Sequence, residues 1–264
     1  MTILDKILAT KREEIAAGMA LKSESVLLDE LAAQPDARPF ADALKAGAPV
    51  GVIAEIKKAS PSAGIIRHRF QPVEIALGYA AAGAACISVL TDEQYFGGKL
   101  ATIAAVRRCT ACPILRKDFI VHPWQVAESR AAGADAILLI AAALQQNELD
   151  LLLERAQQLG MAALVEVHSV AEATVALASG AEMIGINNRN LATFETRLET
   201  TEEITAALPQ LRERMLVSES GIRTAEDIQR VAAAGARAVL VGEALMRAPD
   251  PGAALQKLTD VLRS

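Results

Sequence analysis

The sequence predicts a (β/α)8 barrel, an α/β fold of eight parallel strands, and three observations indicate this class. Short apolar segments rich in β-branched residues end in polar residues, as buried parallel strands do. A Gly-Ala motif after an Ala-rich stretch recurs about every 50 residues, which is two βα units per step, at Gly83, Gly133, Gly180 and Gly235. The length of 264 residues and an apolar content of 52% suit one barrel domain.

The repeated glycines locate the elements along the chain. Each glycine predicts a left-handed helix cap followed by a strand, which starts the even-numbered strands near residues 85, 135, 182 and 237. The odd-numbered strands are expected at residues 51–57, 112–117, 161–167 and 215–218. Right-handed crossovers close eight such strands into a barrel, and the glycine-rich dinucleotide fingerprint of an open sheet is absent from the sequence.

Residues 1–48 are expected to form a helical extension ahead of a barrel domain at 49–264. Two apolar stripes at helical spacing predict helices that end before Pro35 and Pro39, and they comprise Ile3, Leu4, Ile7, Leu8 and Ile15, then Val26, Leu27, Leu28 and Leu31. Such an extension can cover the bottom of the barrel, or it can fold over the mouth where the strands end. The sequence leaves both open.

The composition excludes some classes of binding partner. The net charge is −5 with no long basic run, so nucleic acid is not the expected partner, and an anion must be held by a local site. The longest apolar run, residues 136–144, is too short to span a bilayer, and the N-terminus lacks a signal-peptide core. Three cysteines are typical of a reducing compartment. We therefore expect a cytoplasmic protein, a monomer, without a membrane partner.

Neither cysteine nor histidine spacing indicates a metal or redox centre. Cys109 and Cys112 have redox-motif spacing, but they precede Pro113 where a helix should give way to a strand, so a structural role is expected. The three histidines lack metal-ligand spacing, and they are His68, His122 and His168. No metal is expected.

Four charged residues are expected to converge on the barrel mouth. The period of two puts Glu55 and Lys57 on one face of the first strand. By the same rule Lys117 is in phase with Leu115, and Glu166 with Leu164. A structural ion-pair network is the alternative to acid–base work, although four charges desolvated together without a ligand would be costly.

A second kind of chemistry, anion binding, is predicted after the last two strands. Ser220-Gly221 and Gly242-Glu243 place small residues where backbone N–H groups can approach a phosphate. The carboxylate of Glu243 is then expected to turn toward solvent. The alternative is that these loops need glycine for their backbone conformation alone.

Seven segments together resemble the successive motifs of the indole-3-glycerol phosphate synthase family, in order and over nearly the whole chain. They are AEIKKASPSAGIIR (54–67), ISVLTDEQYFGG (87–98), PILRKDFI (113–120), VEVH (165–168), IGINNRNL (184–191), VSESGI (217–222) and VGEALM (241–246). The resemblance implies a carboxy-lyase of tryptophan biosynthesis without metal or organic cofactor. Its reaction would close 1-(2-carboxyphenylamino)-1-deoxyribulose 5-phosphate to indole-3-glycerol phosphate, carbon dioxide and water.

The resemblance also implies roles for individual residues. Lys117 would be the general acid, Lys57 would hold the charged substrate, and Glu166 would move protons in the dehydration. Glu55 and Asn187 would orient lysine and hydroxyl groups. The implied phosphate-binding residues are Ser60, Gly221, Gly242 and Glu243; the implied substrate contacts are Arg189 and Ser220; and the implied apolar wall is Phe96, Phe119 and Leu191, for which core packing is the alternative.

Three positions depart from the family pattern, namely Ala63, Arg69 and His122. They fall in loops after the first and third strands, so the departures concern loop closure rather than the reaction. Rival hypotheses are phosphoribosylanthranilate isomerase, which needs a Cys/Asp pair at strand ends, a metal-dependent phosphosugar epimerase, and a non-catalytic phosphate-binding barrel. Fold alone does not choose among them.

Overall fold

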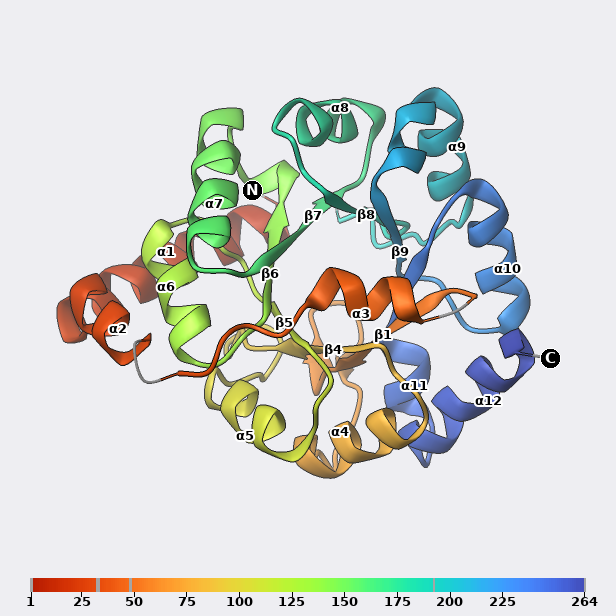
Figure 1. Ribbon diagram of the computed structural model, residues 1–264, viewed down its shortest axis with the longest axis horizontal. Helices are drawn as coiled ribbons and strands as arrows, with labels where there is room; N and C mark the ends of the chain where they lie inside the picture. The colour runs from red at the N-terminus through yellow and green to blue at the C-terminus, as the bar shows by residue number, and fades with distance from the viewer. Residues whose placement is uncertain (1, 32–33, 48, 192, 264) are drawn as a thin grey trace.

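A computed structural model describes residues 2–31, 34–47, 49–191 and 193–263. Its centre is a closed barrel of eight parallel strands in the order β1-β10-β9-β8-β7-β6-β5-β4 (Figure 1). The strands are β1 Gly51–Ile56, β4 Cys86–Leu90, β5 Ile114–Lys117, β6 Ala136–Ile140, β7 Ala162–Val167, β8 Met183–Asn187, β9 Met215–Glu219 and β10 Ala238–Val241. The predicted fold class is confirmed, and the four strands after the repeat glycines begin one residue beyond their predicted starts.

Helices surround the barrel and alternate with its strands. They are α4 Pro72–Ala81, α5 Ala101–Cys109, α6 Pro123–Ala131, α7 Gln146–Gln158, α8 Val170–Ala178, α9 Glu199–Ala207, α10 Ala225–Ala234, α11 Glu243–Arg247 and α12 Pro251–Arg263, with 3₁₀ turns η1 Ala141–Ala143 and η2 Pro209–Glu213. The four repeat glycines all have positive φ, between 76° and 118°, as left-handed caps require. A small antiparallel pair, β2 Ala59–Ser60 and β3 Gly64–Ile65, follows β1 and was not predicted.

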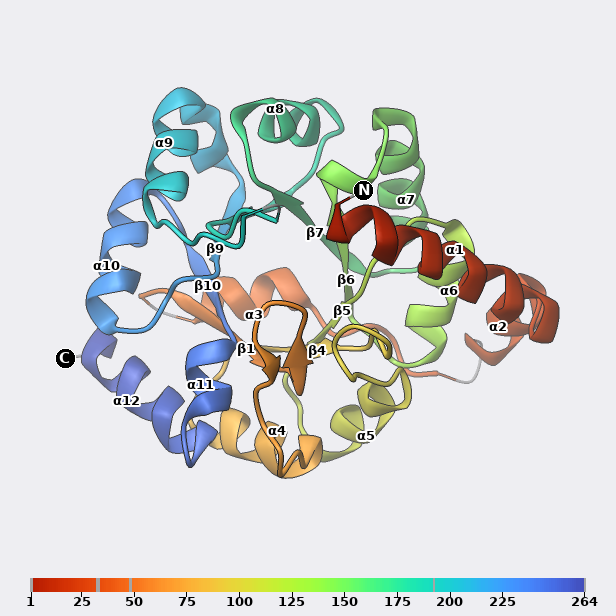
Figure 2. The ribbon, with the colours of Figure 1, turned by 180° about the vertical axis from the view of Figure 1, so that it is seen from behind.

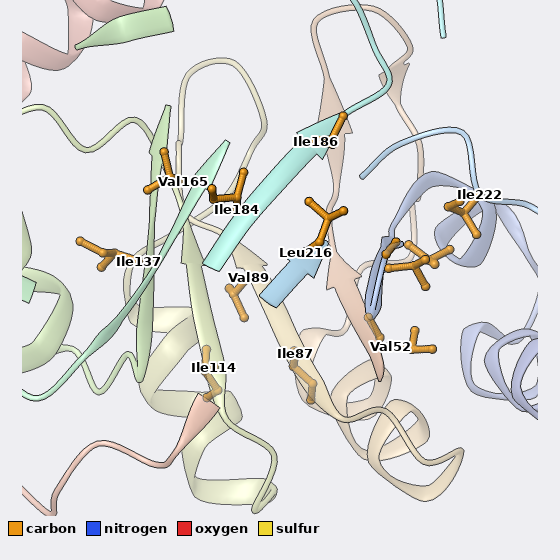
Figure 3. Close-up of a cluster of buried hydrophobic side chains, with 14 of the residues drawn as sticks. Val52, Ile87, Val89, Ile114, Ile137, Val165, Ile184, Ile186, Leu216 and Ile222 are labelled. Carbon is orange, nitrogen blue, oxygen red and sulfur yellow. The ribbon is translucent and has the colours of Figure 1, made fainter. Parts of the chain in front are cut away.

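Strand residues alternate between two buried layers. One layer lies between the strands and the helices, and Figure 3 shows part of it, including Val52, Val89, Ile137, Val165 and Ile186. The other fills the barrel interior, with Ile53, Leu115, Leu138, Leu164, Met183, Val217 and Leu240. Because side chains alternate along a strand, a polar residue two positions after an interior residue points toward the barrel axis. This alternation decides which polar side chains at the strand ends point into the barrel.

The N-terminal extension covers both ends of the barrel with different helices. Helix α3 (Phe40–Ala46) closes the bottom, since Phe40 and Leu44 are buried against interior residues of the strands. Helix α1 (Ile3–Leu21) lies across the opposite end, where Ile3, Leu4 and Ile7 line the main cavity. Figure 1 shows α3 in front, and Figure 2, from behind, shows α1 in front with the β2–β3 pair; α2 (Glu24–Leu31) follows α1. Of the two positions left open by the sequence, the bottom of the barrel is therefore covered by α3 and the mouth by α1.

A buried cluster of charges fixes α1 to the barrel. The Lys11 side chain is 5% exposed, and its Nζ lies 3.0 Å from Asp118 Oδ1 and 3.2 Å from Asp92 Oδ2. Asp118 also accepts hydrogen bonds from Arg116 Nη2 at 3.0 Å and from Thr91 Oγ1 at 2.6 Å. We call Lys11, Asp92, Arg116 and Asp118 the Lys11 cluster. It ties α1 to the segments that follow β4 and β5.

The cysteines occupy the junction predicted for them. Cys109 is the last residue of α5 and Cys112 lies just before β5. All three cysteines are free thiols, and the Sγ atoms of Cys109 and Cys112 donate to backbone carbonyls of Val106 and Ala84. In the described part of the chain, no helix combines the length and the apolar character needed to cross a membrane.

Candidate active site

A cavity of about 560 Å3 opens where the strands end. Every residue that the sequence predicted for the site lines it: Glu55, Lys57, Ser60, Phe96, Lys117, Phe119, Glu166, Asn187, Arg189, Leu191, Ser220, Gly221, Gly242 and Glu243. These residues come from every quarter of the chain and from the ends of different strands, which is the usual origin of barrel active sites. The structure thus brings the predicted residues together, while their roles stay predictions.

Three charged side chains meet at the base of this cavity. The Lys117 ammonium donates to Glu166 Oε2 at 2.8 Å and to Glu219 Oε2 at 2.6 Å. Both carboxylates are almost fully buried, with side-chain exposures of 4% and 1%. Lys117 follows Leu115, Glu166 follows Leu164 and Glu219 follows Val217 in the interior layer, so strand phase alone aims all three at the axis.

The pKa values of these three groups shift in different directions. Burial opposes the charge on Lys117, but Glu166, Glu219 and Glu55 outweigh it and raise the Lys117 pKa. Burial also raises the Glu166 pKa, yet Lys117 and His168 together lower it well below the ordinary value. For Glu219 burial wins: desolvation, with Glu166 and Glu55 nearby, raises its pKa to about 7. One carboxylate is therefore firmly ionised, and the other sits near its midpoint at neutral pH.

Glu219 is the main site residue that sequence reasoning missed. The predicted strand stopped at Ser218, and the segment VSESG was interpreted only as an anion-binding loop. The structure extends β9 to Glu219. One signal was present in the sequence, because Glu219 is in phase with Met215 and Val217. The structure shows how its carboxylate is accommodated: the neighbouring strand β8 carries Gly185, where a Cβ atom would lie 2.1 Å from Glu219 Oε1. The glycine makes room for the carboxylate.

A second ion pair lies at the end of β1, where Glu55 is in the strand and Lys57 follows it. Lys57 Nζ is 2.6 Å from Glu55 Oε1, and both side chains line the cavity as the period of two predicted. Gly242 is required beside them, because a Cβ at that position would lie 2.1 Å from Glu55 Oε1. Gly242 was predicted for phosphate binding alone. Its lack of a side chain also creates the space that Glu55 occupies.

The predicted anion-binding region contains a further ion pair. Arg189 Nη2 lies 3.0 Å from Glu243 Oε2, and Arg247 Nη2 lies 3.0 Å from Glu243 Oε1. The Glu243 side chain, predicted to turn toward solvent, is 30% exposed, and two guanidinium groups hold its carboxylate. Ser220 has φ of 65°, which is strained for a residue other than glycine, and Gly221 follows with φ of 84°. Arg247 also lines the cavity and was not predicted.

Aromatic and aliphatic side chains form another wall of the cavity. The rings of Phe96 and Phe119 lie with centroids 6.1 Å apart and planes inclined by 40°. Leu191 and the α1 residue Ile7 also line the cavity. A planar aromatic substrate can pack against such a surface, which excludes water from the charged trio.

Asn187 and His122 each accept a hydrogen bond from a nearby backbone N–H. Asn187 Oδ1 accepts from the Arg189 backbone N–H at 3.0 Å, so it shapes the turn after β8. His122 lies in the loop after β5, the third barrel strand, as predicted, and it is the N-cap of α6, where its Nδ1 accepts from Trp124 N–H at 3.1 Å. Among the described residues, no group of three or more His, Cys, Asp or Glu side chains is arranged to hold a metal ion.

Comparison with known proteins identifies the family. A family model described as indole-3-glycerol phosphate synthase matches residues 4–258. The indole-3-glycerol phosphate synthase of Aromatoleum aromaticum is 50% identical over 259 residues, covering 97% of this chain and 98% of that protein. The enzyme of the same name from an Azoarcus species is 51% identical over 260 residues, with coverage of 97% and 98%.

Solved structures of other proteins share the fold. The crystal structure of 3-hexulose-6-phosphate synthase superposes with a TM-score of 0.61 at 18% identity, covering 80% of this chain and 99% of that one. A mandelate oxidase variant gives a TM-score of 0.60 at 20% identity, with coverage of 81% and 73%. At such identities the likeness concerns the barrel alone. The sequence relatives carry the assignment, and this chain belongs to the indole-3-glycerol phosphate synthase family.

Proposed function

We propose that the cavity performs the family's reaction with the residues predicted for it, and that Glu219 joins them. The activity is that of a carboxy-lyase, which converts 1-(2-carboxyphenylamino)-1-deoxyribulose 5-phosphate into indole-3-glycerol phosphate, carbon dioxide and water. The observation that carries the residue assignment is the position of Lys117. It is held between two buried carboxylates in the cavity that Phe96 and Phe119 also line, at the end of a barrel strand.

The chemistry requires three proton movements. The aromatic carbon bearing the carboxylate attacks the ketone carbon, and the ketone oxygen takes up a proton. The bond to the carboxylate then breaks, carbon dioxide leaves, and its electron pair restores the aromatic ring. Finally the new hydroxyl takes a second proton and departs as water, while the carbon next to nitrogen loses one. Each turnover therefore consumes one proton in total.

Lys117 is suited to supply the proton to the ketone oxygen. Its charge is maintained by Glu166 and Glu219, so the acid is loaded before chemistry begins. Glu166, held ionised, is suited to remove the proton during dehydration. Glu219 has a pKa raised to about 7, so it exchanges a proton readily at neutral pH and can return one to Lys117 at 2.6 Å.

The remaining residues bind and orient. Lys57, paired with Glu55, presents a cation in the same cavity as the aromatic residues and is suited to the substrate carboxylate. Ser60, Gly221 and Gly242 line the same cavity close to Arg247, and backbone N–H groups together with a guanidinium are suited to the phosphate. A single monomeric chain contains all these groups, and we propose a cytoplasmic monomer.

The decisive experiment is incubation of the purified protein with 1-(2-carboxyphenylamino)-1-deoxyribulose 5-phosphate while indole fluorescence is followed. We expect fluorescence to rise with release of one equivalent of carbon dioxide. Inorganic phosphate should raise the KM without changing kcat, because it competes for the phosphate-binding region. Binding of substrate without product would instead favour a non-catalytic phosphate-binding barrel, which the family assignment disfavours.

A further inference from the structure

A buried histidine stands directly behind the catalytic carboxylate. His168 follows β7 by one residue, and its side chain is 12% exposed. Its Nε2 lies 3.3 Å from Glu166 Oε1, the oxygen that Lys117 does not occupy. This distance suits an ion pair with a protonated imidazole, although among the described residues Nε2 has no aligned hydrogen-bond partner.

A second carboxylate holds the other side of the imidazole. Glu172 Oε2 lies 3.2 Å from His168 Nδ1 and also accepts the His168 backbone N–H at 2.8 Å. The other oxygen of Glu172 accepts from Ser169 Oγ at 3.1 Å. Burial lowers the His168 pKa, but the carboxylates of Glu166 and Glu172, one beside each ring nitrogen, raise it to about 10. At neutral pH the group is an imidazolium between two carboxylates.

His168 and Glu172 face a different cavity from the substrate. A second cavity of about 410 Å3 is lined by both residues and by Thr2, Asn188 and Arg197. Neither His168 nor Glu172 lines the catalytic cavity, whereas Glu166 does. Glu195 and Arg197 are the other charged residues on the wall of this second cavity. The chain of groups from Lys117 through Glu166 and His168 to Glu172 therefore leads out of the catalytic cavity without crossing the substrate.

We propose that His168 is the positioning residue of Glu166 and, with Glu172, relays the proton that each turnover takes up. The relay rests on the proposed function, whose balance requires one proton from solvent. When Lys117 has protonated the ketone oxygen, Glu166 loses one neighbouring cation and becomes a better base. His168 Nε2 then gives its proton to Glu166 Oε1, and after rotation of the carboxyl group the same oxygen gives that proton to Lys117. The neutral imidazole keeps its Nδ1 proton, so the ring turns over before its bare nitrogen takes up a new proton, through Glu172, from water in the second cavity.

This route would supply protons to Lys117, in addition to the one that Glu219 can return, while substrate occupies the catalytic cavity. A substrate bound beside the aromatic wall would keep water from Lys117, whereas His168 and Glu172 line the second cavity. The two oxygens of Glu166 face different cations, which is the geometry that a relay needs. A merely structural histidine would need no opening behind it.

The test uses His168→Asn, which keeps a polar group but cannot carry a proton through the ring. We expect kcat to fall about tenfold, less than the hundredfold or more for a direct acid, with KM within about twofold. The acid limb of the kcat profile should move up by about one pH unit, because Glu166 loses a cation. Added imidazole should restore part of the activity. His68→Asn, whose side chain lines neither cavity, is the matched control and should behave as the wild type.

Other results overturn the relay. A kcat within twofold of the wild type, or a loss with neither a pH shift nor imidazole rescue, would leave His168 with a structural role only. If His168→Asn fails to fold, Glu172→Gln decides, since it keeps the imidazole and should lower kcat about threefold with KM unchanged; an unchanged kcat there contradicts the relay. Titration of His168 by NMR in the resting protein tests the ion pairs independently of turnover, so a failure of the relay is distinguishable from a failure of the proposed function.

Discussion

Two clusters of buried charge meet on strand β5, and they are built differently. Arg116 belongs to the Lys11 cluster, with Lys11, Asp92 and Asp118. The next residue, Lys117, points to the barrel axis and contacts Glu166 and Glu219. Neighbouring positions on one strand thus send one cation to each side of the barrel wall.

The difference lies in how well the charges are balanced. In the Lys11 cluster two buried cations face two buried carboxylates, and the more exposed Glu14 and Glu128 also pair with Lys11 and Arg116. Although burial opposes it, Arg116 and Lys11 lower the Asp118 pKa to about 2. In the catalytic cavity one ammonium faces two carboxylates, and burial raises the Glu219 pKa to about 7. A balanced cluster keeps every proton fixed, whereas an unbalanced one leaves a proton free to move. The first suits a structural anchor and the second suits catalysis.

The largest effect should come from Lys117→Met. The change keeps length and apolar character but removes the proton donor, so kcat should fall by about a hundredfold or more. It also leaves Glu166 and Glu219 facing each other, so the pair should retain one proton in place of the lost cation. Steady-state kinetics at saturating substrate measures kcat, and a thermal melt of the same sample checks that the variant is folded. A kcat near the wild-type value would remove Lys117 from the mechanism.

Arg116→Met tests the other side of the same strand. Arg116 donates to Asp118, Glu128, Ser129 and Thr91, and its loss leaves buried partners uncompensated. The free energy of unfolding should fall by about 3 kcal/mol, while kcat per folded molecule should stay within a few-fold. Denaturant unfolding and active-site titration separate the two quantities. A selective loss of kcat with normal stability would show that the clusters are not functionally distinct.

These clusters also show what the sequence could reveal. Strand phase predicted Glu55, Lys117 and Glu166 correctly at the cavity, because the period of two is a local property of the chain. The same rule would have found Glu219, had the strand been extended by one residue. Lys11 could not be found this way, because its partners Asp92 and Asp118 are far from it in the sequence, by 81 and 107 positions.

The extension illustrates the same limit. An apolar stripe in residues 1–48 predicted that helices would bury one face, but periodicity does not say against which surface. The structure assigns α3 to the bottom of the barrel and α1 to the mouth. The spacing of His168 in the sequence indicates no metal site and predicts no other role. Its place beside Glu166 and Glu172 is seen only in the folded chain.

A pH-dependent difference in stability should separate the clusters. Glu219 binds its proton more tightly in the folded state than in the unfolded state, so stability should fall as pH rises from about 4.5 to about 7. Asp118 has the opposite sign: its contribution is present above about 4 and is lost as pH falls toward 2. Glu219→Gln should therefore gain about 1–2 kcal/mol relative to the wild type between pH 5 and 8. Urea unfolding across that range measures it, and parallel curves for the two proteins would contradict the assignment.

The smallest effect is expected at His122, which the family pattern placed in a closing loop and the structure places at the start of α6. That helix carries Gln125, Glu128 and Ser129, the groups that surround Arg116, so His122 belongs with the structural side of the barrel wall. Aspartate is a stronger N-cap than histidine and favours the helix dipole. His122→Asp should raise the free energy of unfolding by about 0.5–1 kcal/mol and leave kcat and its viscosity dependence unchanged. A slower, more viscosity-dependent turnover without added stability would instead indicate that His122 acts in loop closure. The distinction between a structural and a catalytic face of β5 would then not apply to the loop that follows this strand.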